Sequence, residues 1–196
     1  MNIARLASGA LLFSALSIVA HATPLTFTES VTGSGSLGSA FTNQLITLSA
    51  TGDTSGIVTG VGLYTLFIPT ATLTVNGFAP VTLTGGVTVF SNSLIQVAGF
   101  EGHSPTFDVL DTVSPAFSSY TLLGAINATG SAQNSAAGTA FSTSGGSFIL
   151  NNTSGNATFT AGASILGIAP EPGSIALLGT GMLALAGTVR RKLCRV

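Results

Sequence analysis

Four polar residues between positions 101 and 111 have side chains that could bind a metal ion. They are Glu101, His103, Asp108 and Asp111. Carboxylate oxygens together with loop carbonyls suit Ca²⁺, whereas a single histidine without a neighbouring cysteine suits Zn²⁺ less well. Residues three apart on a strand point to opposite faces, so Asp108 and Asp111 reach one ion only if the segment turns. We expect solvated loop acids, and keep a Ca²⁺ site of Glu101, Asp108 and Asp111 as the alternative.

Motifs for catalysis are weak in this chain. A serine hydrolase would combine His103 with a serine and an acid, but there is no Gly-x-Ser-x-Gly nucleophile elbow. A glycosidase needs two carboxyl groups roughly 5 to 10 Å apart across a cleft, and no motif supports that arrangement. The run Gly33-x-Gly35-x-x-Gly38 matches a dinucleotide-binding fingerprint in its letters. Strand-like sequence follows it where that fingerprint needs a helix, so we interpret it as a flexible loop. We expect no enzyme activity and, calcium apart, no cofactor.

The charged residues are divided between the middle of the chain and its ends. All five Lys and Arg residues lie within residues 1–22 or 190–196. Residues 23–169 therefore have a net charge of −5 from five acids, with histidine neutral: Glu29, Asp53, Glu101, Asp108 and Asp111. Nucleic-acid binding is excluded because it needs Lys or Arg to neutralise phosphates. An acidic polysaccharide would need a bridging cation to bind this domain. The absence of cysteine from residues 23–169 excludes disulfides there.

Short runs of alternating apolar and polar residues indicate strands throughout residues 23–169. Glycine-rich turn signals separate them, with Asn76-Gly77 a candidate tight turn, and residues 131–138 are expected to be a loop. This spacing predicts an all-β domain, an antiparallel β-sandwich, with a β-helix as the alternative. The expected strands are residues 25–28, 45–48, 63–67, 71–75, 81–83, 87–90, 94–97, 107–110, 120–123, 147–150 and 157–160.

Residues 1–22 have the pattern of a secretory signal peptide. Arg5 supplies the positive region, and an apolar run over residues 6–20 follows it. Ala20 and Ala22 flank His21 in a small-x-small cleavage pattern, so the mature chain is expected to start at Thr23. The general secretion machinery is therefore a predicted partner, and residues 23–169 form the predicted exported domain.

The C-terminal tail, residues 170–196, combines a helix breaker, an apolar run and a basic end. Pro170 and Pro172 flank Glu171 and keep residues 170–173 out of a helix. The uncharged run over residues 174–189 predicts a single transmembrane helix, roughly 25 Å long, near the lower limit for a bilayer core. A basic stop on the cytoplasmic side ends it at residues 190–195: Arg190, Arg191, Lys192 and Arg195.

This three-part tail resembles the PEP-CTERM sorting signal of exported bacterial proteins. Its matching parts are Pro170-Glu171-Pro172, the apolar span and the cluster Arg190-Arg191-Lys192. The resemblance implies processing near Pro-Glu-Pro by an exosortase, a membrane-embedded cysteine protease-transpeptidase, typically in Gram-negative bacteria that make exopolysaccharide. It also implies an inner-membrane precursor that ends at the cell surface or is secreted. Some names for this tail mention ice-binding proteins, a label that implies no ice binding here.

The domain before the tail resembles domains that accompany this signal and have no assigned activity. The matching residues lie in 33–43, 107–111 and 115–120, and the resemblance implies no site. We therefore expect a structural or interaction protein of the cell envelope or biofilm matrix, with exopolysaccharide as a candidate partner. The alternatives are a carbohydrate- or calcium-binding surface module and, more remotely, a hydrolase.

Overall fold

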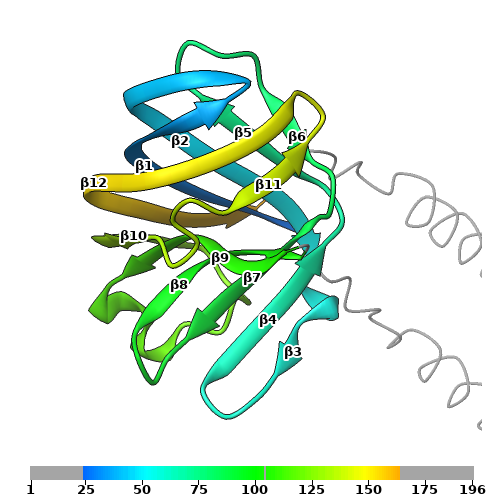
Figure 1. The fold of residues 1–196 in the computed structure, drawn as a ribbon. Coiled ribbons are helices and arrows are strands. Elements are labelled where there is room, and N and C mark those ends of the chain that lie inside the picture. Colours follow the sequence, from blue (N-terminus) through cyan, green and yellow to red (C-terminus); the bar gives the residue numbers. More distant parts are fainter. Residues whose placement is uncertain (1–23, 104, 164–196) are drawn as a thin grey trace, which may run out of the picture. The chain divides into compact units, whose positions relative to one another are not determined.

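The computed structural model describes residues 24–103 and 105–163, which form the β domain (Figure 1). The predicted signal peptide with Ala20 and Ala22 lies outside the described residues. So do the predicted sorting motif Pro170-Glu171-Pro172, the span 174–189 and the basic stop 190–195. No helix in the described part of the chain is long and apolar enough to cross a membrane.

Twelve strands and two short 3-10 segments make up the described domain. Every strand pairing is antiparallel, so the all-β, antiparallel prediction is confirmed. In chain order the elements are β1 (Pro24–Leu37), β2 (Ser39–Asp53), η2 (Thr54–Gly56), β3 (Val58–Thr59), β4 (Leu63–Ile68), β5 (Ala71–Val75), β6 (Val81–Leu83), β7 (Val87–Asn92), β8 (Val97–His103), β9 (Thr106–Val113), η3 (Pro115–Ser119), β10 (Ile126–Gln133), β11 (Ala140–Thr143) and β12 (Gly146–Ala163).

The strands form one continuous sheet instead of the two separate sheets of a sandwich. Their order is β1-β2-β5-β6-β11-β12-β10-β9-β8-β7-β4-β3, and β1 also pairs with β12. This second pairing closes β1, β2, β5, β6, β11 and β12 into a ring. The remaining strands continue from the C-terminal half of β12, which pairs with β10, whereas its N-terminal half pairs with β11. The sandwich prediction is therefore not confirmed, and the antiparallel ladders also differ from the parallel ladders of a β-helix.

The core lies inside this curled sheet, and the pattern of β1 shows how it forms. Residues of β1 alternate strictly between buried and partly exposed, because successive side chains point to opposite faces. Phe27 of β1 and Phe100 of β8 both pack against Phe159 of β12, with ring centroids 6.4 and 6.2 Å apart. Each such buried aromatic stabilises the domain by roughly 1.5–3 kcal/mol. The ring and the rest of the sheet thus share one core.

Two segments predicted as strands are turns in the structure. Residues 93–96 form the turn between β7 and β8, with Gln96 at φ 57°, and residues 121–123 follow η3 with Leu122 at φ 63°. Leu122 is fully buried, so this apolar side chain packs into the core although its backbone lies in a turn. Three strands were missed, β3, β10 and β11, and β8 was predicted only at Val97. The Ser, Thr, Gly and Ala residues of β10 and β11 give little alternation, and residues 131–133, expected to be a loop, belong to β10. The Asn76-Gly77 turn is confirmed, with Gly77 at φ 87° and a Phe78 N–H to Val75 carbonyl bond.

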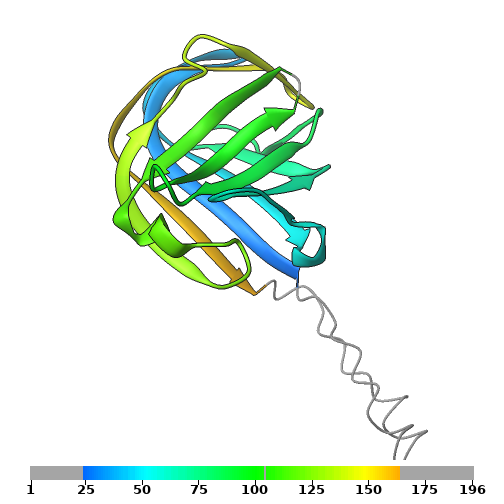
Figure 2. The ribbon, with the colours of Figure 1, turned by 90° about the horizontal axis from the view of Figure 1, so that it is seen from below.

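The glycine run at 33–38 is strand and hairpin turn, so its interpretation as a flexible loop was wrong. Gly33 and Gly35 lie in β1, and Gly38, at φ 69°, makes the turn to β2. A Cβ atom at Gly35 would overlap the carbonyl oxygen of Ile149, and one at Gly33 would lie 2.6 Å from the carbonyl oxygen of Asn152. Glycine at these positions therefore permits close approach of β1 and β12, which run side by side in Figure 2.

Candidate functional site

The β8–β9 hairpin brings the three predicted calcium ligands to one face of the sheet. Glu101 of β8 pairs with Asp108 of β9, while Gly99 pairs with Asp111. Paired residues in adjacent strands share a face, so Asp108 and Asp111 lie on the same side although they are three apart. A bulge makes this possible, because the register shifts by one residue between Phe100 and Glu101.

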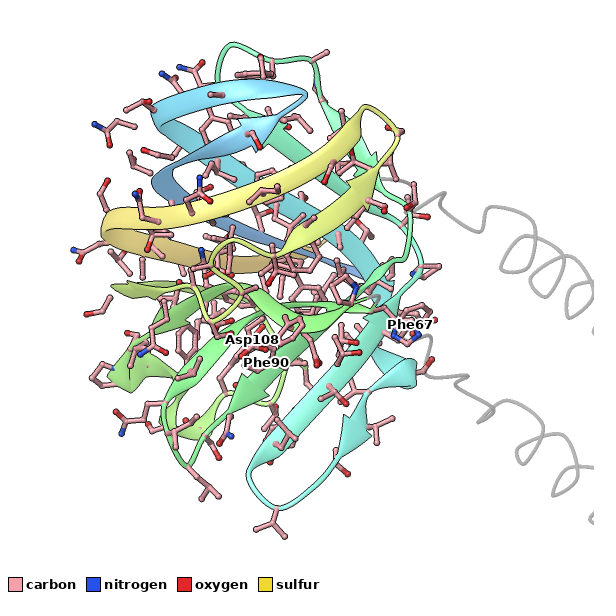
Figure 3. All side chains as sticks on the ribbon, in the orientation of Figure 1. Phe67, Phe90 and Asp108 are labelled. Atoms are coloured by element: carbon pink, nitrogen blue, oxygen red, sulfur yellow. The ribbon has the colours of Figure 1, made fainter. Side chains whose placement is uncertain are left out.

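Aromatic and hydroxyl side chains from β4 and β7 continue the same face. Phe67 pairs with Thr88, and Thr88 pairs with Glu101. Phe90 pairs with Gly99, which places it in the row of Asp111. Figure 3 labels Phe67 of β4, Phe90 of β7 and Asp108 of β9. We call this surface, on the side of the sheet away from the core, the aromatic–acidic face: Phe67, Thr88, Phe90, Glu101, His103 and Asp108.

One edge of the aromatic–acidic face is formed by two rings in contact. Phe67 is 50 % exposed, and its ring centroid lies 4.8 Å from that of His103. The backbone at Gly86 lies close to the Phe67 ring, since a Cβ atom at position 86 would lie 3.1 Å from the ring carbons. The phenyl ring of Phe67 is therefore held in place at the surface, with half of the side chain exposed.

Two acids of the β8–β9 hairpin have raised pKa values. Burial raises the pKa of Asp111 to about 9, and the charges of Asp108, Glu29 and Glu101 add to the effect. Burial and the charge of Asp108 also raise the pKa of Glu101, while His103 acts in the opposite direction. Both carboxyl groups therefore hold their protons to a higher pH than they would in water.

Asp111 is the least exposed acid of this cluster and is not fully hydrogen-bonded. It is 3 % exposed, and its Oδ1 atom has no hydrogen-bond partner. A Cβ atom at position 99 would lie 2.5 Å from that oxygen, so Gly99 leaves the room that Asp111 occupies. The carboxyl group is thus held beside Asp108 on the same face.

The geometry does not assemble a metal site from these acids. Across residues 24–103 and 105–163, no three side chains from His, Cys, Asp and Glu gather closely enough to hold a metal ion. His103 contacts Phe67, on the far side of the face from Asp111. The Ca²⁺ site of Glu101, Asp108 and Asp111 stays a prediction, and the structure adds nothing in its favour beyond the shared face.

The comparison with protein families identifies the tail. The PEP-CTERM protein-sorting motif matches residues 169–192. This protein carries a PEP-CTERM sorting signal. The signal indicates an exported precursor that an exosortase-type enzyme processes. No curated protein and no solved structure matches the chain.

The match covers the predicted sorting motif and most of the predicted basic stop of this PEP-CTERM protein. Pro170, Glu171 and Pro172 fall within the matched range, as do Arg190, Arg191 and Lys192, while Arg195 follows it. The aromatic–acidic face lies in the β domain, to which the motif assigns no role.

One buried carboxyl of the PEP-CTERM protein was missed as a site residue. Glu29 of β1 is fully buried, and burial raises its pKa to about 8. The Thr112 hydroxyl donates a 2.8 Å hydrogen bond to its Oε1 atom, while Oε2 has no partner. A signal for it existed, because Leu25, Phe27, Glu29 and Val31 share one face by alternation. That pattern places a carboxyl among core residues.

Proposed function

We propose that this PEP-CTERM protein is a non-enzymatic structural or interaction protein of the cell envelope or extracellular matrix. The observation that carries the proposal is the sorting signal at residues 169–192, which follows a β domain without any Lys or Arg. An exosortase-type enzyme and the general secretion machinery are its handling partners. The membrane holds the precursor through residues 174–189 before the processed protein reaches the surface or is secreted.

The ends of the β domain suit a protein displayed from a single attachment point. Leu25 at the start of β1 pairs with Ala163 at the end of β12. The first and last described strands therefore begin and end side by side, so both ends of the described domain lie at one place in the sheet.

A second candidate function, a carbohydrate-binding surface module, is supported by the aromatic–acidic face. Half-exposed Phe67 lies in the same sheet row as Glu101 and Asp108. Sugar-binding surfaces combine rigid aromatic rings with a few polar groups that fix orientation. The calcium-binding alternative has weaker support, since no three ligands converge within the described β domain.

Processing is tested by replacing both prolines of the sorting motif, Pro170→Ala and Pro172→Ala. In cells that contain the exosortase-type enzyme, we expect the precursor to accumulate in the membrane fraction. The mature form, measured by intact mass and fractionation, should fall by about tenfold or more. The physical reason is that alanine removes the fixed φ and lets the helix extend into the processing site.

The matched control is Pro80→Ala, an exposed proline of the β domain, which should leave mass and location unchanged. The decisive comparison is a strain without the processing enzyme. If the protein has the same mass and location there as in the parent strain, the sorting part of the proposal is wrong.

A further inference from the structure

We infer that the aromatic–acidic face binds a cationic glycan, a saccharide whose rings carry free ammonium groups. This inference rests on the proposed interaction function and names the class of partner. It combines three features of the face: an exposed ring, paired acids and the absence of Lys and Arg from residues 23–169.

The exposed ring supplies the apolar part of the site. Phe67 is 50 % exposed, and contacts with His103 and with the backbone at Gly86 fix its position. A flat ring of this kind packs against the C–H face of a pyranose, and its negative π face attracts a cation within about 6 Å of the centroid. Thr88, between Phe67 and Glu101 in the sheet row, adds a hydroxyl for hydrogen bonding.

The acids supply the electrostatic part. Glu101 and Asp108 are directly opposite each other on adjacent strands, an arrangement of like charges that destabilises a sheet. Asp111, 3 % exposed and with an unpartnered Oδ1, lies in the next row of the same face. Residues 23–169 contain no Lys or Arg to pair with Glu101 and Asp108, so a cationic partner supplies a counter-charge that the basic residues of the chain do not provide there.

The same observations select among partners. An acidic polysaccharide is repelled by a domain with five acids and no Lys or Arg. A bare metal ion finds no group of three ligands among the described residues. A neutral glycan could stack on Phe67 but would leave Glu101 and Asp108 without a counter-charge. An ammonium-bearing sugar meets both the ring and the carboxylates.

The test measures binding by calorimetry, with the mature protein purified after export and processing. The probes are a β-linked glucosamine hexamer and its fully N-acetylated counterpart, which has the same rings without the charge. We expect the glucosamine hexamer to bind at least about tenfold more tightly, and its affinity to fall as salt shortens the screening length.

Three variants locate the site. Phe67→Ala should weaken binding of the glucosamine hexamer by about tenfold, through loss of stacking and of the cation–π contact. The double variant Glu101→Gln and Asp108→Asn should weaken it at least as much while keeping side-chain size. The matched control is Asp53→Asn, which removes one negative charge from the cap of η2, a residue that is not part of the aromatic–acidic face, and should change affinity little. Thermal unfolding of each variant checks that the fold is retained.

Several results would overturn the inference. Equal affinity for the two hexamers would show a neutral-sugar site, and no heat with either at millimolar concentration would show none. Equal weakening by Asp53→Asn would show unspecific charge attraction. All of these leave the sorting proposal standing, because mass and location of the protein are measured independently of any glycan.

Discussion

Glu29 and Asp111 are buried carboxyl groups with no cation beside them, and this makes the stability of the domain depend on pH. Burial raises the pKa of Glu29 to about 8 and that of Asp111 to about 9. The unfolded chain releases these protons near their ordinary values of 4.5 and 3.8. The stability that these two protonated carboxyl groups contribute is therefore fully present below about pH 4. It is lost as pH rises towards 8 for Glu29 and towards 9 for Asp111.

We predict that Glu29→Gln flattens this pH dependence. Each buried carboxyl lowers the free energy of unfolding by about 1.4 kcal/mol per pH unit within its window. Glutamine cannot ionise and still offers an oxygen to the Thr112 hydroxyl. Denaturant unfolding at pH 5, 7 and 9 should show a smaller loss for the variant than for the parent chain.

The control for this experiment is Asp53→Asn. Asp53 is fully exposed, and hydrogen bonds from Ser55 lower its pKa, so it stays ionised from pH 5 to 9. Its replacement should leave the slope unchanged over that range. An identical slope in the Glu29→Gln variant and the parent chain would contradict the assignment of the pH dependence to Glu29.

Among the elements, β1 and β12 are held together by glycines that permit a close approach. A Cβ atom at Gly35 would overlap the carbonyl oxygen of Ile149, and backbone atoms cannot move away as the end of a flexible side chain can. We predict that Gly35→Ala lowers the free energy of unfolding by roughly 1–3 kcal/mol, as overpacking typically does. Chemical denaturation measures this directly.

Gly162→Ala provides a matched glycine substitution in β12. No atom lies within 4 Å of a Cβ built at Gly162, so alanine there should change stability by less than about 0.5 kcal/mol. Equal effects of the two substitutions would mean that the approach of β1 to β12 does not require glycine.

The elements also show where sequence patterns succeed and fail. Alternation predicted the strands around Leu25, Leu73 and Val89, because their apolar residues face the core at every second position. It failed at Leu122, which is buried from a turn. It also missed β11, whose register is set by pairing with β12 and β6. Local patterns cannot report which distant strand will supply the neighbouring ladder.

At the scale of the whole molecule, β12 links the ring to the rest of the sheet. Its residues 156–161 pair with β10, and residues 158–163 pair with β1. Phe159, in the same stretch, contacts Phe27, Phe100, Phe117 and Tyr120. The last eight described residues therefore join both parts of the sheet to one core.

We predict that a chain ending at residue 155 does not fold, whereas one ending at residue 163 does. The shorter chain loses the β10–β12 ladder, half of the β1–β12 ladder and the central core ring of Phe159, more than a domain of typical stability can tolerate. Circular dichroism with thermal unfolding should show a cooperative transition for the longer chain alone. A cooperative transition in both would mean that β12 is dispensable beyond residue 155.

The sequence by itself determined the sorting signal, the all-β class and the charge of the domain. Those properties depend on composition and on residues close together in the chain, such as Pro170-Glu171-Pro172 and its apolar span. Tertiary structure alone decided that one sheet closes through β1 and β12. It also decided that a bulge turns Asp108 and Asp111 to one face beside Phe90. The reason is physical: strand register and closure arise from pairing between distant segments, such as Leu25 with Ala163, and no local pattern encodes that distance.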